Sequence, residues 1–357
     1  MNHTLLTQQL FTPGPVRMDL DILRLGSVQT PYFRNAAFSD LVLECEAWLL
    51  KMANAPLGSR VVFLTAAGTA AMEATVINLL SSDSPVGIIN GGTFGQRFVN
   101  ICSVHRIPAQ VIKVDRDPLT DGKALANLGQ ISALLINAHE TSVGHLYDLQ
   151  ATGDHCRRHG CLHVVDVISL FVTDPVDMQA QHIDALILSS HKGLALPPGL
   201  AMVILSPRAL DQVHPSGSFY FDFATHLTDG ARGQTPFTPA VSIFLQLHAR
   251  LKKIDEDGIE SQWAHAQQVA EFFRSKIQGL PLVPYSKHMP NAITALQLTN
   301  GVSAVGVVEA LQKEHNCVVA PNGGALRDSV FRVSHMGNTN PVDIDVLVTA
   351  LKQVLKV

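Results

Sequence analysis

The sequence predicts an α/β protein, with a mostly parallel seven-stranded sheet in a large domain and a smaller C-terminal α+β domain. From Arg60 onward, short apolar runs alternate with amphipathic segments. This strand, helix, strand order is typical of a parallel sheet that is covered by helices on both faces. The chain has 357 residues, of which 46% are hydrophobic and 16% charged. Such a chain can bury a large core in roughly two or three units of ordinary size.

The expected elements follow in order along the chain. Apolar runs predict the strands of the large sheet at 61–65, 86–90, 110–114, 132–137, 162–166, 185–190 and 200–205. Amphipathic segments predict helices at 70–80, 150–159 and 241–253, the last one after a long loop at 214–238. In the small domain we expect helices at 260–277, 303–314 and 342–355, and strands at 293–298 and 330–333. These elements suggest an N-terminal extension at 1–16, a large domain at 17–255 and a small domain at 256–357.

Composition and the N-terminal residues narrow the range of functions. A formal net charge of -4 offers no basic surface for nucleic acid, which favours small-molecule chemistry. Residues 1–10 lack the basic start and apolar core of a signal peptide, and no stretch reaches about 18 uninterrupted apolar residues. We therefore expect a cytoplasmic protein without a membrane partner. The 5 cysteines are scattered and show no CxxC spacing, so reduced thiols are expected.

Lys192 is the residue that points most directly to a reaction. It follows the apolar run 185–190 and precedes a Gly/Pro-rich turn, so a strand delivers one amine into a tight turn. Asp166 ends another apolar strand, where an unpaired carboxylate is costly. An aspartate and a lysine at neighbouring strand ends suit an enzyme that uses pyridoxal 5'-phosphate. The aspartate would keep the pyridine nitrogen protonated, and the lysine would carry the cofactor as a Schiff base.

An anion site is expected where the first strand of the sheet meets a helix. Gly68, Thr69 and Ala70 would present free backbone amides at the N-terminus of this helix, and the Thr69 hydroxyl would add a donor. The alternative is an ordinary turn in which Thr69 caps the helix. The position after a parallel strand favours the ligand site, because ligands gather at the carboxyl ends of such strands.

Two further loops that follow strands carry candidate cofactor contacts. In 90–98, glycines would let the backbone approach a ligand while Phe94 stacks on an aromatic ring. Phe94 could equally be a plain core residue. In 137–144, Thr141 and Ser142 could reach a cofactor hydroxyl or phosphate, although this segment also fits a polar surface turn.

Ser169 and His191 complete the candidate contacts. Ser169 lies three residues after Asp166 and can hydrogen-bond a neighbouring cofactor group, or it is an ordinary turn serine. His191, next to Lys192, could orient the phosphate.

A competing interpretation is a zinc site in residues 154–163. This segment holds three histidines and two cysteines, and His155 and His159 would share one helix face. However, the helix is expected to end at Gly160 and the chain then enters the strand that leads to Asp166, so the remaining ligands face away. We therefore expect no metal.

Motifs along nearly the whole chain resemble class V aminotransferases of fold type I. The motifs are Thr12-Pro-Gly-Pro15, Gly68-Thr69 before a helix, Asn90-Gly-Gly-Thr-Phe-Gly-Gln-Arg97, His139-Glu-Thr-Ser-Val-Gly144, Asp166-Val-Ile-Ser169, Ser190-His-Lys-Gly193 with Pro197-Pro-Gly199, and Val330-Phe-Arg-Val333. The most similar branches are the alanine:glyoxylate (or serine:pyruvate) and the 2-aminoethylphosphonate:pyruvate aminotransferases. The resemblance implies the fold type I architecture and pyridoxal 5'-phosphate as cofactor.

The resemblance also assigns roles to individual residues. Lys192 would be the Schiff-base lysine, Asp166 the partner of the pyridine nitrogen, and Ser169 a cofactor contact. Phe94 would be the stacking ring, in a place that the family usually fills with Trp or Tyr. Arg332 would clamp the substrate carboxylate.

A segment near the end of the large domain resembles one that reaches a second subunit in this family. It is Gln234-Thr-Pro-Phe-Thr-Pro239, in which Thr235 and Thr238 would contact the phosphate bound by that subunit. The resemblance therefore implies a homodimer with shared active sites.

The implied activity is ping-pong transfer of an amino group from a small amino acid, alanine or serine, to a small 2-oxo acid, glyoxylate or pyruvate. Aminotransfer from 2-aminoethylphosphonate to pyruvate remains an alternative. A cysteine desulfurase is another, but it would need a mobile cysteine, and Cys317 is expected in a buried strand.

Two positions depart from the family pattern. Where relatives often have Gly-Ser-Gly, this chain has Ala66-Ala67-Gly68, and His191 replaces the common Gln. Phosphate affinity could differ at these positions.

Overall fold

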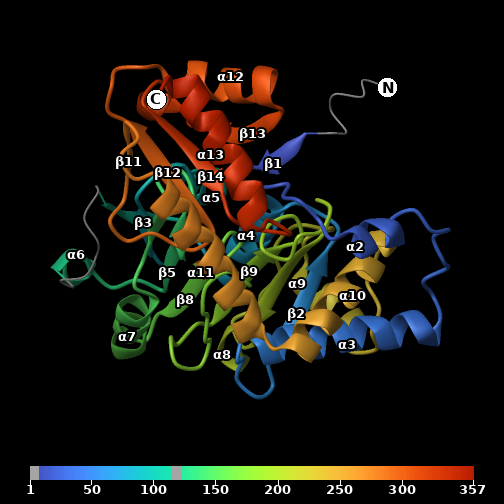
Figure 1. The fold of residues 1–357 in the computed structure, drawn as a ribbon. Coiled ribbons are helices and arrows are strands. Elements are labelled where there is room, and N and C mark those ends of the chain that lie inside the picture. Colours follow the sequence, from blue (N-terminus) through green and yellow to red (C-terminus); the bar gives the residue numbers. More distant parts are fainter. Residues whose placement is uncertain (1–7, 115–122) are drawn as a thin grey trace.

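The computed structural model describes residues 8–114 and 123–357, which form two sheets with their helices (Figure 1). The larger sheet has seven strands in the order β2-β10-β9-β8-β5-β3-β4. Its strands are β2 (Arg60–Leu64), β3 (Val86–Asn90), β4 (Ala109–Lys113), β5 (Ala133–Asn137), β8 (Leu162–Asp166), β9 (Ala185–Ser189) and β10 (Ala201–Leu205). All pairs are parallel except those of β10, which runs antiparallel to both of its neighbours. The predicted seven-stranded, mostly parallel sheet is confirmed.

Except at the edge strand β4, whose residues are exposed or half-buried, the large sheet is buried on both faces because alternate residues of its strands enter different apolar clusters. Val61 and Phe63 of β2 pack in one cluster with side chains of α3 and α10. Val62 and Leu64 pack in the other with side chains of α4 and α5. The apolar runs in the sequence have this origin, since a parallel strand needs apolar residues on both sides.

Nine helices among the described residues surround this sheet. They are α2 (Leu20–Leu25), α3 (Ala36–Met52), α4 (Gly68–Leu79), α5 (Thr93–Val104), α6 (Lys123–Ala126), α7 (Leu149–His159), α8 (Pro207–Leu210), α9 (Phe223–Gly230) and α10 (Val241–Asp257). A two-stranded hairpin of β6 (His139–Glu140) and β7 (His145–Leu146) projects from the end of β5.

Two of these helices, α5 and α9, lie in segments where the sequence predicted loops. Helix α9 lies inside the segment 214–238, where Asp222 caps it by accepting a hydrogen bond from the Thr225 amide at 2.9 Å. Helix α5 begins at Thr93, inside the glycine-containing segment 90–98. Glycines lower helix propensity, so the sequence pattern hid this helix. Its N-terminus is stabilised by the carboxylate of Glu140, which accepts from the first amides of the helix.

The smaller sheet has the order β1-β13-β14-β12-β11 and packs against α11 (Ile259–Lys276), α12 (Ala304–His315) and α13 (Pro341–Leu355). Its strands are β1 (Gln9–Phe11), β11 (Leu282–Pro284), β12 (Ile293–Leu298), β13 (Cys317–Pro321) and β14 (Val330–Ser334). The short helix η1 (Gly324–Leu326) connects β13 to β14. The domain limits given above stay a prediction.

The N-terminal segment takes part in the smaller sheet. Strand β1 lies beside β13 and pairs with it in parallel (Figure 1). Phe11 is buried in the apolar cluster of that sheet. After β1 the chain crosses to the large sheet, and this crossing brings Gly14 to Lys192. Within residues 8–114 and 123–357, no helix is both long enough and apolar enough to cross a membrane.

Candidate active site

A cavity of about 100 Å³ lies at the carboxyl ends of the central strands of the large sheet. Its lining residues are Ala67, Gly68, Thr69, Phe94, Arg97, Thr141, Asp166, Ile168, Ser169, His191 and Lys192. Eight of these were candidate site residues in the sequence. The cavity therefore gathers residues from five separate segments, loops or helix N-termini, each of which follows a strand of the large sheet.

Asp166 is a buried carboxylate at the end of β8. Its side chain is held by the Asn137 amide, which donates to Oδ2 at 2.5 Å, and by the Ile168 backbone amide, which donates to Oδ1 at 2.8 Å. Burial raises the pKa of Asp166 to about 6, and the two hydrogen bonds oppose this shift. A carboxylate in this state needs a cation to stabilise its ionised form.

Lys192 lies in the turn after β9 and is largely buried. Burial lowers the pKa of its amine to about 8, the nearby Arg332 lowers it further, and Asp166 opposes the shift. The turn packs closely against the N-terminal segment. At Gly14 there is no room for a side chain, since an added Cβ would lie 2.7 Å from Lys192 Cδ. The result is an amine that is neutral in roughly a tenth of molecules at pH 7, far more often than an ordinary lysine, and the neutral form is the one that a nucleophile or base requires.

The N-terminus of α4 points its first amides at the cavity. Gly68 and Thr69 occupy the first two positions of the helix, where backbone amides have no partner within the helix. Ala70 differs from the expectation, because its amide already donates to the carbonyl of Ala67 at 2.9 Å and its side chain does not line the cavity. Two backbone amides and the Thr69 hydroxyl remain available to an anion.

Phe94 is half-buried on the first turn of α5 and lines the cavity. The backbone amides of Phe94 and Gly95 donate to the buried carboxylate of Glu140, Gly95 at 2.9 Å. Ser142 donates its hydroxyl to the same carboxylate at 2.5 Å and accepts from the Thr93 amide at 3.1 Å. Ser142 is thus engaged in holding the start of α5 and is not among the lining residues.

Three other candidates lie in the cavity wall. The hydroxyls of Thr141 and Ser169 are 2.8 Å apart and buried. His191 Nδ1 lies 3.0 Å from the Ser189 hydroxyl, and burial lowers the pKa of His191 to about 4, so its ring is neutral near neutral pH.

Arg332 lies on β14, the central strand of the small sheet, and is not among the residues that line the cavity. It donates from Nη2 to the Pro321 carbonyl at 2.6 Å, while its Nε is buried without a partner among the described residues. Its charge nevertheless reaches Lys192, since it lowers the pKa of that amine. An orphaned guanidinium donor near the reactive lysine suits a substrate carboxylate.

Thr235 and Thr238 lie away from this cavity. The Thr235 hydroxyl donates to the Phe237 carbonyl at 2.7 Å, and its own carbonyl accepts from Arg34. Thr238 is exposed and lines a wide surface hollow with Tyr32 and Phe33. Neither threonine contacts the cavity of its own chain.

Four residues of the site carried no assigned role in the sequence analysis: Asn137, Glu140, Arg97 and Gly14. Each acts through a partner far away in the sequence. The polar strand end at Asn137 and the glycine between two prolines at Gly14 were visible signals, but their partners were not.

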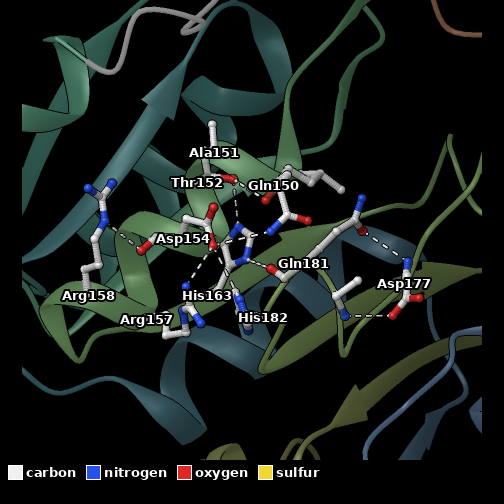
Figure 2. Close-up of polar contacts among 12 residues, drawn as sticks. Gln150, Ala151, Thr152, Asp154, Arg157, Arg158, His163, Asp177, Gln181 and His182 are labelled. Carbon is white, nitrogen blue, oxygen red and sulfur yellow. Dashed lines mark hydrogen bonds and ion pairs between the residues drawn. The ribbon is translucent and has the colours of Figure 1, made fainter.

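The histidine-rich segment of α7 does not gather metal ligands. Figure 2 shows His163 held between Thr152 and Gln181, with Nε2 3.1 Å from the Thr152 hydroxyl and Nδ1 3.1 Å from the Gln181 carbonyl. Asp154 pairs with Arg157 and His182 instead. Among residues 8–114 and 123–357, no group of three His, Cys, Asp or Glu side chains is arranged to hold a metal ion.

Cys317 is the first residue of β13 and is buried. Burial raises the pKa of its thiol, and the residue does not line the cavity. Nothing in this position resembles a mobile catalytic cysteine.

Comparison with solved structures shows the class of protein that has this fold. The chain superposes on the aspartate aminotransferase of subgroup IV from Thermus thermophilus with a TM-score of 0.89 and 29% identity, covering 97% of this chain and 99% of that one. It superposes on alanine–glyoxylate aminotransferase from Nostoc sp. with a TM-score of 0.92 and 25% identity, covering 98% and 95% of the two chains. The fold is that of the fold type I aminotransferases.

Sequence comparison then gives the family. A relative named as the small subunit of a soluble hydrogenase from a Synechococcus strain is 30% identical over 97% of this chain and 92% of its own length. The family described as class V aminotransferases matches residues 28–344. The chain belongs to the class V aminotransferase family.

This family implies pyridoxal phosphate, and the cavity fits that group. A buried amine lies beside a buried carboxylate whose raised pKa calls for a cationic partner. A helix N-terminus with unpaired amides and a half-buried aromatic ring line the same space. These are the features that a phosphorylated pyridine aldehyde would need.

Proposed function

We propose that this aminotransferase uses pyridoxal phosphate to move an amino group from a small amino acid, alanine or serine, to glyoxylate or pyruvate by a ping-pong mechanism. The observation that carries the proposal is the meeting of Lys192 and Asp166 in one cavity with the α4 N-terminus. The similarity to alanine–glyoxylate aminotransferase supports the substrate class.

Each residue of the cavity has a proposed role in holding the cofactor or in moving a proton. Lys192 would hold the cofactor through its amine, with Asp166 at the ring nitrogen, Phe94 against the ring face, and Gly68 and Thr69 at the phosphate. When bound, the cofactor supplies an aldehyde and an electron-withdrawing ring that make the substrate α-proton removable. The Lys192 amine, with its pKa near 8, would be the base that takes that proton and returns it.

Arg332 would orient the substrate carboxylate. Its buried, unpartnered Nε and its nearness to Lys192 support this role. A carboxylate held there would present the α-carbon to the amine, and the same contact would serve both the amino acid and the oxo acid.

We also propose a homodimer in which Thr235 and Thr238 reach the cofactor phosphate of a second subunit. The exposed position of Thr238, beside the exposed Tyr32, supports this arrangement because neither threonine serves its own cavity. Ultracentrifugation of the protein would test the dimer, and a monomer at working concentration would contradict it.

The experiment that tests the reaction uses the two half-reactions separately. The loaded protein is mixed with alanine, serine, aspartate or 2-aminoethylphosphonate without an acceptor, and the absorbance change from the aldehyde to the amine form of the cofactor is followed. Alanine or serine should convert the cofactor stoichiometrically, and glyoxylate or pyruvate should restore it. Conversion only by aspartate or by the phosphonate would reject the proposed donors, and Lys192→Ala should show no conversion.

A further inference from the structure

Arg97 is a cation in the wall of the active-site cavity that the sequence did not single out. It lies one helical turn after Phe94 on α5, and its Cζ stands 4.7 Å from the centre of the Phe94 ring. Its Nη1 donates to the Thr69 hydroxyl at 2.9 Å. No carboxylate among the described residues forms an ion pair with it, and its charge acts through space on Asp166, whose pKa it lowers.

The charges of the cavity favour an anion near Arg97 and Thr69. Its lining holds two cationic side chains, Arg97 and Lys192, and one carboxylate, Asp166. His191 adds no charge near neutral pH, since burial lowers its pKa to about 4. A guanidinium stays charged throughout the working pH range, and the N-terminus of α4 adds a partial positive charge.

We propose that Arg97 binds the phosphate group of the cofactor, together with the Thr69 hydroxyl and the first amides of α4. This inference rests on the proposed function. The Thr69 hydroxyl that now accepts from Arg97 marks the point where both groups converge, and an oxyanion placed beside it would be within reach of the guanidinium fork.

The contact between Arg97 and the Phe94 ring fixes the position of both side chains on α5. Because Arg97 and Phe94 lie on the same face of α5, at positions i and i+3, one helix presents both the ring that stacks on the cofactor and the cation that holds its phosphate. Glu140 fixes the start of this helix through the amides of Phe94 and Gly95. The phosphate contact is therefore supported by a rigid helix rather than by a loop.

The test compares two aldehydes that differ only in the phosphate. Full-length protein freed of cofactor is titrated with pyridoxal phosphate and with pyridoxal, and binding is followed by absorbance. Arg97→Met should weaken pyridoxal phosphate binding by about 10- to 100-fold, the loss expected for a charge-assisted hydrogen bond, and change pyridoxal binding by less than about 3-fold. Arg97→Lys should fall between the two. Arg157→Met, at an exposed arginine on α7, is the matched control and should change neither.

Each other outcome overturns the inference in a distinct way. Equal losses for both aldehydes would mean that Arg97 only supports Phe94. Unchanged cofactor affinity with a raised KM for an acidic substrate would assign Arg97 to the substrate. If the unmodified protein binds neither aldehyde, the proposed function itself is wrong and the inference falls with it. Circular dichroism of each variant separates these results from a loss of folding, and Arg97→Lys provides the second variant.

Discussion

Asn137 and Asp166 end two neighbouring parallel strands, β5 and β8, at the same level of the sheet, and the Asn137 amide donates to the Asp166 carboxylate at 2.5 Å. The register of the sheet thus provides a neutral donor to a buried acid that has no cationic side chain bound to it. The Asn137 carbonyl oxygen is itself buried without a partner in the described part of the chain. Asn137 can therefore hydrogen-bond to a neutral side chain at position 166, but it cannot supply the negative charge that Asp166 carries.

Asp166→Asn should therefore separate folding from catalysis. The Asn137 amide can rotate to accept from the new side chain, so the variant should fold. Loss of the negative charge at the ring nitrogen should slow conversion of the cofactor by an amino acid by at least about 10²-fold. Rapid-mixing absorbance on the loaded variant would measure this effect, and an unchanged rate would contradict the assignment.

The same substitution predicts a pH dependence of stability. The pKa of Asp166 in the folded protein, about 6, lies above its ordinary value of 3.8. Its contribution to stability is therefore present below pH 3.8 and is lost as pH rises through 6. In cofactor-free protein, Asp166→Asn should gain stability relative to the natural protein between pH 4 and pH 7, as followed by urea unfolding. A constant difference across this range would show that the carboxylate is not perturbed.

The amine of Lys192 should control how fast the aldehyde is captured. Its pKa of about 8 lies below the ordinary value of 10.5, because burial disfavours the charged form. The rate of pyridoxal phosphate capture by cofactor-free protein should rise with pH and level off above about 8, since only the neutral amine reacts. Stopped-flow absorbance measures this rate. A midpoint near 10.5 would mean that the amine is solvated, and Lys192→Ala should show no covalent capture.

Gly14→Ala should disturb the position of Lys192. The new Cβ would lie 2.7 Å from Lys192 Cδ and 2.8 Å from the His191 carbonyl oxygen, at a backbone φ of +138° that favours glycine. We expect slower aldehyde capture and a loss of about 1–3 kcal/mol in the free energy of unfolding. Gly279→Ala is the control, because its φ is also positive, +83°, but nothing lies within 4 Å. Equal aldehyde capture by both variants would show that Gly14 does not position the lysine.

Glu140→Gln should loosen the start of α5. The carboxylate accepts from the amides of Phe94 and Gly95 and from the Ser142 hydroxyl. A glutamine would turn an amide group toward these donors and remove the charge that stabilises the helix N-terminus. We expect a loss of about 1–3 kcal/mol in urea unfolding and weaker binding of the cofactor. Glu309→Gln, at an exposed ion pair with Lys313, should change stability by less than about 1 kcal/mol. Similar losses in both variants would contradict the special role of Glu140.

The sequence by itself determined the large sheet and the two charged residues, Asp166 and Lys192, at the carboxyl ends of its strands. Six of the seven strands are largely buried and therefore apolar along their length, so they were visible as runs, while the more exposed edge strand β4 still has the apolar pair Val111 and Ile112. Asp166 and Lys192 stood out as charges at run ends. Gly68 and Thr69 were visible for the same local reason, as a turn between a strand and a helix. Each of these features depends on neighbours in the sequence.

Only the tertiary structure decided which side chains meet. Arg97 reaches Thr69, Glu140 holds the amides of α5, and Gly14 touches Lys192 because strand order and register bring distant segments to one edge of the sheet. Ser142 appeared free in the sequence, yet it is bound to Glu140. Hydrogen bonds and charges act over a few ångströms in space and not along the chain, so their partners cannot be read from a local pattern.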